Sequence, residues 1–409
     1  MRIPVLAMVA AFCVAMPIFA GDWPQWGGPE RNFKVKAPAL ADGWGESGPN
    51  IMWKRDLGGG HAALVARDGV LYVPHNNGTD NAVTAIDAKT GKDIWSYTWP
   101  VVKPEGVNLD FGTGPNTTPL LLKDRMVLID FAGKLICLDL KGKLLWSHDM
   151  MAEYKTKIPY FGYSASPILY KGNVIVQVGG ESIGIAAFNP KNGEMVAKGG
   201  PYGVSHGSPR IMTVGGLDQI VFYGPDQIYG ADANTLEPFW EVEVTNQYHN
   251  NSTDPIPCPG DILLAPSQLD SATRALKMTR DGDKIKAEQV WHNANIKNHY
   301  WNGILLGDFV YMSLGSGSSS SLACFDYKTG EIKWRERGFN HINSVYADGK
   351  VIFIDHDGKL GMGKISPEKW TVLAQHELLS KPARTAPVLL GDKLYARDHK
   401  ILVAIDLAK

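Results

Sequence analysis

One eleven-residue unit recurs along this chain and restricts its fold more than any other feature. The segment AIDAKTGKDIW at 85–95 returns as CFDYKTGEIKW at 324–334, and a copy one residue shorter covers 137–146. Two weaker copies, one without the tryptophan and one without the glycine, cover 187–197 and 230–240. The pattern indicates a strand that ends at Asp, then a tight turn with Gly at positive φ, then a second strand that ends in Trp. We expect a small residue in one copy to leave room for the indole of a neighbouring copy, so that copies pack side by side.

A second element precedes each copy. The segments 166–176 and 386–395 both read as an apolar strand, a two-residue turn and another strand. The turns of eight such hairpins align at Gly69, Asp124, Gly172, Gly216, Asp261, Asp308, Gly349 and Asp392. Their mean spacing of about 46 residues is typical of one four-stranded blade.

The repeats therefore predict an all-β fold, an eight-bladed β-propeller of four-stranded antiparallel blades. The last copy, at 404–406, stops before any tryptophan, whereas the strand 51–53 carries a tryptophan without a preceding copy. We expect these N- and C-terminal strands to pair and close the ring, which removes an exposed sheet edge. Seven blades are the alternative, because the units at 275–291 and 361–373 are degenerate.

The N-terminus has the pattern of a secretory signal. Arg2 precedes an uncharged apolar stretch at 3–20, and a polar segment follows. We predict a signal peptide at 1–20, an N-terminal extension at 21–50 and the propeller at 51–409, in a periplasmic or secreted protein. An uncleaved membrane anchor is the alternative. After signal cleavage we expect no transmembrane span.

Charge and cysteine content argue against a nucleic-acid-binding protein and against a disulfide-stabilised fold. The chain carries 41 basic and 42 acidic residues, which gives no electrostatic reason to expect a nucleic-acid partner. Cys137, Cys258 and Cys324 make an odd number after the predicted cleavage site, and we expect small buried thiols rather than disulfides.

The repeat at 85–95 resembles the tryptophan-docking motif of the quinoprotein or pyrroloquinoline quinone (PQQ)-like β-propellers. The segment DWPQWGGP at 22–29 resembles an N-terminal signature of exported PQQ-like repeat proteins. The resemblance covers nearly all of the chain after the signal and implies one of two functions. PQQ-dependent dehydrogenases hold the quinone and a calcium ion, whereas BamB binds no cofactor and acts through protein contacts.

The sequence departs from the dehydrogenase pattern. It has no adjacent cysteine pair and no Cys-x-x-Cys-His. We find no segment that matches the family's calcium ligands or catalytic Asp residue by residue. PQQ with calcium therefore remains an option that no particular residue supports, and the cofactor stays unassigned.

Propeller sites form at a channel mouth, where the loops that enter the innermost strands converge. A fixed offset from each hairpin places eight candidate ligand-binding residues there: His61, Asn116, Ser164, His206, Thr253, Tyr300, His341 and Arg384. Such a ring suits an anionic or sugar-like ligand, with Arg384 as a bidentate donor. A transition metal or a histidine general base are alternatives, as is a polar mouth without function.

Two loops add aromatic side chains near this ring, at 160–163 and 298–302. Aromatic faces beside polar groups suit sugars or a planar quinone, and they equally suit loop packing. Asp254 and other scattered carboxylates have no metal-ligand spacing, and we expect them to be solvated.

Our leading hypothesis is an exported binding or scaffold module with a protein partner or a small-molecule or carbohydrate ligand. The alternative is an enzyme that uses the mouth residues, either a PQQ-dependent alcohol or sugar oxidoreductase or a carbohydrate lyase or hydrolase.

Overall fold

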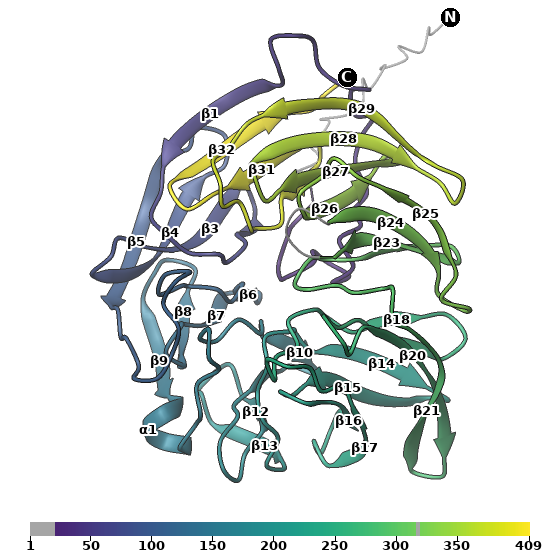
Figure 1. Ribbon diagram of the computed structural model, residues 1–409. Helices are drawn as coiled ribbons and strands as arrows, with labels where there is room; N and C mark the ends of the chain where they lie inside the picture. Colours follow the sequence, from purple (N-terminus) through teal and green to yellow (C-terminus); the bar gives the residue numbers. More distant parts are fainter. Residues whose placement is uncertain (1–20, 316–319) are drawn as a thin grey trace, which may run out of the picture.

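The computed structural model describes residues 21–315 and 320–409, so the predicted signal peptide 1–20 lies outside the described residues. Eight four-stranded antiparallel sheets form a ring around a central channel (Figure 1). The predicted eight-bladed propeller is confirmed, and the seven-bladed alternative is wrong. Figure 1 shows β6 and β26 next to the channel and β9 and β29, at the other edges of their sheets, at the rim.

Four blades make up the first half of the ring. They consist of β2 (Val65–Arg67), β3 (Val70–Asn76), β4 (Asp80–Asp87) and β5 (Asp93–Pro100); β6 (Leu120–Leu121), β7 (Arg125–Ile129), β8 (Lys134–Asp139) and β9 (Leu144–Asp149); β10 (Ile168–Tyr170), β11 (Asn173–Gln177), β12 (Ile185–Phe188) and β13 (Met195–Gly199); and β14 (Arg210–Val214), β15 (Leu217–Tyr223), β16 (Gln227–Asp232) and β17 (Pro238–Glu243). A five-residue helix, α1 (Met150–Tyr154), follows β9.

The second half also has four blades, the last of which uses both ends of the chain. They consist of β18 (Ile256–Cys258), β19 (Ile262–Ala265), β20 (Thr273–Asp281) and β21 (Lys284–Asn293); β22 (Ile304–Leu306), β23 (Phe309–Leu314), β24 (Ser321–Asp326) and β25 (Ile332–Glu336); β26 (Ile342–Ala347), β27 (Lys350–Asp355), β28 (Lys359–Ile365) and β29 (Trp370–Glu377); and β30 (Val388–Leu390), β31 (Lys393–Arg397), β32 (Ile401–Asp406) and β1 (Asn50–Asp56). All eight predicted hairpin turns fall between the first and second strands of a blade.

The ring closes as the termini predicted. Strand β1 pairs with β32 in antiparallel register, with Trp53 opposite Ala404. In Figure 1 the purple N-terminal strand lies beside the yellow C-terminal strands. No blade is therefore left with an open seam between the chain ends.

The indole of one blade packs on a turn glycine of the next blade. Trp95 of the first blade lies over Gly142, which is in the last turn of the second blade, where an added Cβ would come 2.6 Å from the ring. Its Nε1 donates a hydrogen bond of 3.0 Å to the Leu140 carbonyl. The turn glycine therefore makes room for the indole. Three further indole–glycine contacts follow this pattern: Trp53–Gly91, Trp146–Gly193 and Trp291–Gly330.

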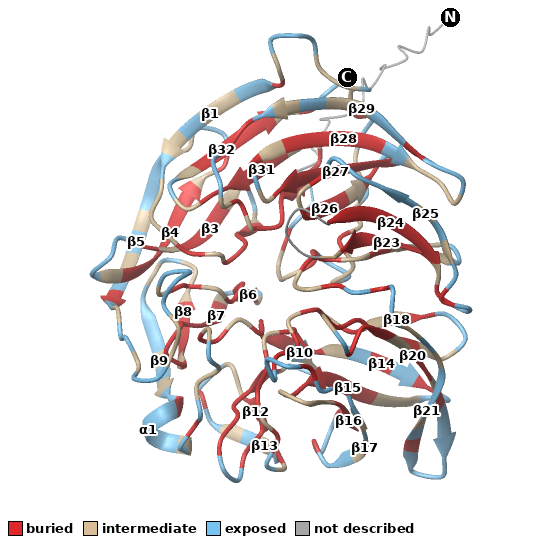
Figure 2. Ribbon diagram, in the orientation of Figure 1, coloured by how far each residue is buried: buried red, intermediate tan, exposed pale blue. Residues whose placement is uncertain are grey.

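Apolar burial lies mainly between neighbouring blades. Figure 2 shows the inner strands as mostly buried and the rim strands as mostly exposed. Strand β4 is buried along its middle, whereas β5 alternates between exposed and half-buried residues. Cys137, Cys258 and Cys324 are buried free thiols, as predicted. In the described residues no helix is long and apolar enough to cross a membrane.

The segment before β1 runs across the ring. Trp23 pairs with Ala66 of the first blade, and Lys34 pairs with Tyr346 of the seventh. Three apolar side chains of the segment are fully buried: Trp23, Phe33 and Leu40. The segment is therefore tied to the propeller core, and it contributes to both mouths of the channel.

Candidate functional site

Six of the eight predicted ring residues line one cavity of about 470 Å³ at a channel mouth. They are His61, Asn116, Ser164, His206, Tyr300 and Arg384. Each stands in the loop that leads into the first strand of its blade. We call this space the histidine cavity.

Hydrogen bonds between successive loops hold the ring together. The His61 amide donates to the Pro115 carbonyl at 2.9 Å, and the Asn116 side chain donates to the Phe161 carbonyl at 3.3 Å. The His206 imidazole lies 3.3 Å from the Ser164 hydroxyl. Because each loop bonds to the next, the mouth is built as one network rather than as separate loops.

The other two predicted residues do not line the cavity. Thr253 is 3% exposed, and its hydroxyl donates to the Asn298 side-chain oxygen at 2.9 Å. His341 is also buried and stacks on Trp301, with 4.9 Å between ring centroids and 11° between ring planes. Both side chains pack inside the loop layer.

Arg384 is the main cation of the cavity. Its guanidinium carbon lies 4.1 Å from the Phe111 ring centroid and 5.8 Å from that of Tyr300. Its Nε is buried without a hydrogen-bond partner in the described part of the chain. A guanidinium held by aromatic faces keeps its planar donors free for a carboxylate.

The histidines around Arg384 are neutral. Burial lowers the pKa of His206 to about 4. Burial, together with the nearby His341 and Arg384, lowers the pKa of His299 to about 4. Burial, with added repulsion from His399 and Arg384, brings the pKa of His61 well below its usual value. Near neutral pH these rings are therefore uncharged hydrogen-bonding groups.

The N-terminal segment supplies one wall of the cavity. The Trp26 indole donates to a carboxylate oxygen of Asp254 at 2.7 Å, and the second oxygen accepts the Ser208 amide at 2.7 Å. Arg210 lies 2.9 Å from the same carboxylate, whose side chain is 13% exposed. The expectation that Asp254 is solvated is wrong, because these three donors enclose it.

Sequence reasoning missed Trp26 because it lies outside the repeats, although the DWPQWGGP motif marked its segment. The two aromatic loops were noticed, and the structure divides their roles. Phe161 and Tyr300 line the cavity, whereas Trp301 is 1% exposed and packs among the loops. Phe111, whose ring lies 5.5 Å from that of Phe161, completes an aromatic wall.

The three ring histidines do not form a metal site. Only His61 and His206 reach the cavity. Within residues 21–315 and 320–409, no group of three or more histidine, cysteine or acidic side chains is arranged to hold a metal ion.

Comparison with known proteins gives matches of two kinds. A family model described as outer membrane protein assembly factor BamB matches residues 41–200. The quinohemoprotein alcohol dehydrogenase ADH IIB of Pseudomonas putida is 26% identical over 209 residues, which cover 46% of this chain and 29% of that protein. The quinoprotein alcohol dehydrogenase PedH of Pseudomonas putida is 29% identical over 146 residues, covering 34% and 22%. The matched segments thus span less than a third of these relatives.

Solved structures share the fold at low sequence identity. A europium-containing methanol dehydrogenase superposes with a TM-score of 0.68 at 14% identity, covering 94% of this chain and 89% of its own. BamB from Moraxella catarrhalis superposes with a TM-score of 0.54 at 16% identity, covering 86% and 98%. One architecture therefore serves both an enzyme and an assembly factor.

Proposed function

We propose that this chain, which is a PQQ-like β-propeller, is a binding module that takes an acidic sugar in the histidine cavity. The observation that carries the proposal is Arg384, whose guanidinium lines the cavity, contacts two aromatic rings and forms no ion pair with any described residue. A ligand carboxylate would supply the counter-charge.

The remaining lining suits the rest of such a ligand. Neutral imidazoles, hydroxyls and side-chain amides alternate with aromatic faces around the cavity. Sugar hydroxyls need uncharged donors and acceptors, and the faces of sugar rings pack on aromatic rings. The volume of about 470 Å³ lies within the usual range for sites of small molecules.

The calcium ion that accompanies the quinone in the related dehydrogenases does not fit these residues. Calcium takes about six to eight oxygen ligands, including carboxylates. Among the described residues that line the cavity, the single carboxylate is that of Asp254. Its oxygens already accept from Trp26 and Ser208, and Arg210 lies 2.9 Å away, where it would repel a cation.

The histidines also favour binding over catalysis. A general base works best with a pKa near the working pH. His206 and His299, with pKa values of about 4, are weak bases at neutral pH and serve better as hydrogen-bonding groups. The low pKa values therefore argue against these histidines as general bases.

Isothermal titration calorimetry with glucuronate and galacturonate, and with glucose and galactose as neutral counterparts, tests the proposal. We expect the acidic sugars to bind at least about tenfold more tightly. Arg384→Gln should weaken that binding by about 10- to 100-fold, as expected for one lost charge-assisted pair. Arg337→Gln, at an exposed position directly after β25 that does not line the cavity, is the matched control and should change nothing.

Equal binding of neutral and acidic sugars, or an unchanged affinity in Arg384→Gln, would refute the proposal. The low pKa values add a second check. Affinity should stay level between about pH 5.5 and 8, because neither the histidines nor the ligand carboxylate titrates there.

We also propose that the chain acts outside the cytoplasm, on the basis of the predicted signal peptide 1–20. Cell fractionation of the full-length chain tests this, and a cytoplasmic, unprocessed product would contradict it.

A further inference from the structure

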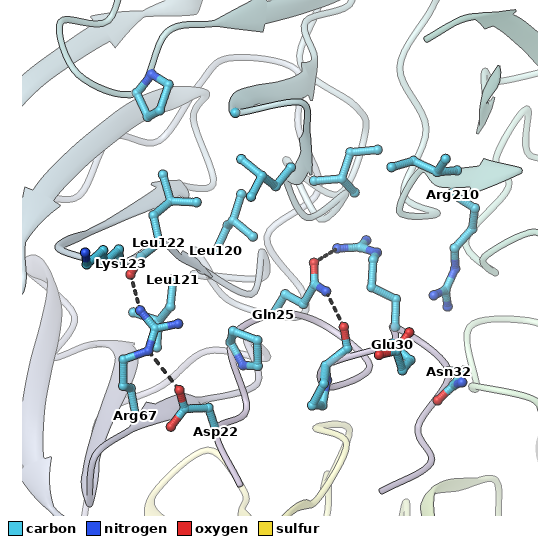
Figure 3. A pocket seen from close by; sticks show the side chains of 18 of the residues that line it. Asp22, Gln25, Glu30, Asn32, Arg67, Leu120, Leu121, Leu122, Lys123 and Arg210 are labelled. Carbon is cyan, nitrogen blue, oxygen red and sulfur yellow. Dashed lines mark hydrogen bonds and ion pairs between the residues drawn. The ribbon is translucent and has the colours of Figure 1, made fainter. Parts of the chain in front are cut away.

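A second cavity, of about 1290 Å³, opens at the opposite mouth, on the side of the hairpin turns. The N-terminal segment forms one side of it, and the first strands of several blades form the other (Figure 3). We call it the turn-side cavity. It exceeds the usual size of a small-molecule pocket, which is up to about 1,000 Å³.

The turn-side cavity has an excess of positive charge on a chain whose net charge is −1. Seven basic and four acidic side chains line it. Two of the basic residues are neutralised locally: Arg67 pairs with Asp22 at 3.0 Å, as Figure 3 shows, and Arg125 pairs with Asp124 at 2.8 Å. Of the remaining basic residues, Lys123 and Lys191 are exposed.

Part of this charge is buried. The Arg31 guanidinium donates to the Gln25 side-chain oxygen and to the Pro167 and Pro209 carbonyls, at 3.2, 3.1 and 3.3 Å, and its buried Nε has no partner among the described residues. Arg210, which also lines the cavity, forms its ion pair with Asp254. Burial and the neighbouring Arg210 lower the pKa of Arg31 to about 9, which shows how poorly its charge is compensated. The Asp254 carboxylate is thus the counter-charge for both Arg31 and Arg210.

The walls between these charges are aliphatic. Leu169 and Ile211 are 41% and 37% exposed, and other leucines and isoleucines line the same space. In the described residues no aromatic side chain lines it, in contrast to the histidine cavity. The lining therefore suits aliphatic side chains better than sugar rings.

Strand edges also contribute backbone hydrogen-bonding groups to the wall of the turn-side cavity. The first strands β10 and β14 each pair with one neighbouring strand only, so their other edges face the channel. The edge of β6 is partly occupied, because the Leu121 amide donates to the Pro24 carbonyl at 2.7 Å. Unpaired strand edges accept extended peptides, with main-chain hydrogen bonds for affinity and side-chain pockets for specificity.

We propose that the turn-side cavity is the docking site for an extended acidic peptide segment of a partner protein. Its carboxylates would pair with the exposed rim lysines Lys123 and Lys191 and be attracted by the buried charge of Arg31, while its aliphatic side chains pack on Leu169 and Ile211. This inference goes beyond the proposed function and stands on different residues, so either can fail without the other.

Fluorescence anisotropy of labelled peptides tests it. The probe is a decapeptide with four Glu and two Leu, and the matched peptides carry Gln or Lys in place of Glu. We expect the Glu peptide to bind and to weaken with added salt, while the Lys peptide does not bind. The double variant Lys123→Glu/Lys191→Glu should weaken binding about tenfold or more.

A control variant separates a local site from general charge. Lys103→Glu/Lys157→Glu makes the same charge change at exposed positions in loops on the other face of the ring. It should bind the Glu peptide within about twofold of the original chain. Equal losses in both double variants, or equal binding of the Glu and Gln peptides, would overturn the inference. So would a preference for polygalacturonate, or for free citrate, over the Glu peptide.

Discussion

The contact between Trp95 and Gly142 offers a direct test of how the blades are held together. Gly142 has φ +87°, and an added Cβ would lie 2.6 Å from the Trp95 ring. Gly172 is an internal control, because it has φ +85° while a Cβ there meets nothing within 4 Å. The two Gly→Ala variants therefore share the same backbone strain and differ in the indole contact.

The expected costs follow from these distances. Left-handed backbone costs alanine about 1–2 kcal/mol at either position. At Gly142 the ring must also move by about 1 Å to reach ordinary carbon contact, which adds about 1–3 kcal/mol of overpacking. That movement strains the 3.0 Å bond from Trp95 to the Leu140 carbonyl, which is worth about 1 kcal/mol. Gly142→Ala should thus lose about 2–4 kcal/mol more of unfolding free energy than Gly172→Ala.

Urea unfolding, followed by tryptophan fluorescence and by far-UV circular dichroism, measures this difference when the two transitions coincide. In a Trp95→Ala background the difference between the glycine variants should disappear, because the Cβ then has no ring to meet. Losses equal within about 0.5 kcal/mol in the original background would refute the proposed role of the turn glycine.

Three further outcomes are expected. Asp254→Asn should cost about 3–5 kcal/mol of unfolding free energy, because it leaves Arg210 without its counter-charge. Asp124→Asn, which removes an exposed pair, should cost less than about 1 kcal/mol. Similar losses in the two variants would contradict the assignment of a buried pair. Unfolded histidines take up protons near pH 6.5, whereas folded His206 does so near pH 4, so stability that is present above pH 6.5 should fall between those values, with a share of up to about 3 kcal/mol from His206. Because other buried histidines, among them His299, also have a pKa of about 4, His206→Asn should reduce the loss by that share in unfolding curves measured from pH 7 to 4. Burial raises the thiol pKa to about 12 for Cys137 and Cys258 and to about 11 for Cys324. Ellman's reagent at pH 8 should therefore label these three thiols only after unfolding. Rapid labelling of these thiols in the native chain would contradict the prediction.

The sequence alone determined the ring. Its turns, strands and indoles repeat at nearly constant spacing, and each blade is specified by local residues. The pairing of β1 with β32 could be predicted from the same unit, because the copy near the C-terminus lacks its tryptophan and the strand near the N-terminus has a tryptophan without a copy before it. Six mouth residues could also be located, since a fixed offset from each first strand puts every loop at the same height in the ring.

The tertiary structure decided which of those side chains meet a ligand. Thr253 and His341 have the predicted positions, but His341 has φ +55° and stacks on Trp301, which turns it away from the cavity. The environment of Asp254 depends on Trp26, which lies 228 residues away in a segment outside the repeats. A periodic sequence determines the path of the backbone in each repeat. The direction of a side chain, and the position of a segment that crosses the ring, depend on contacts between residues that are far apart in the sequence, and no local pattern predicts those contacts.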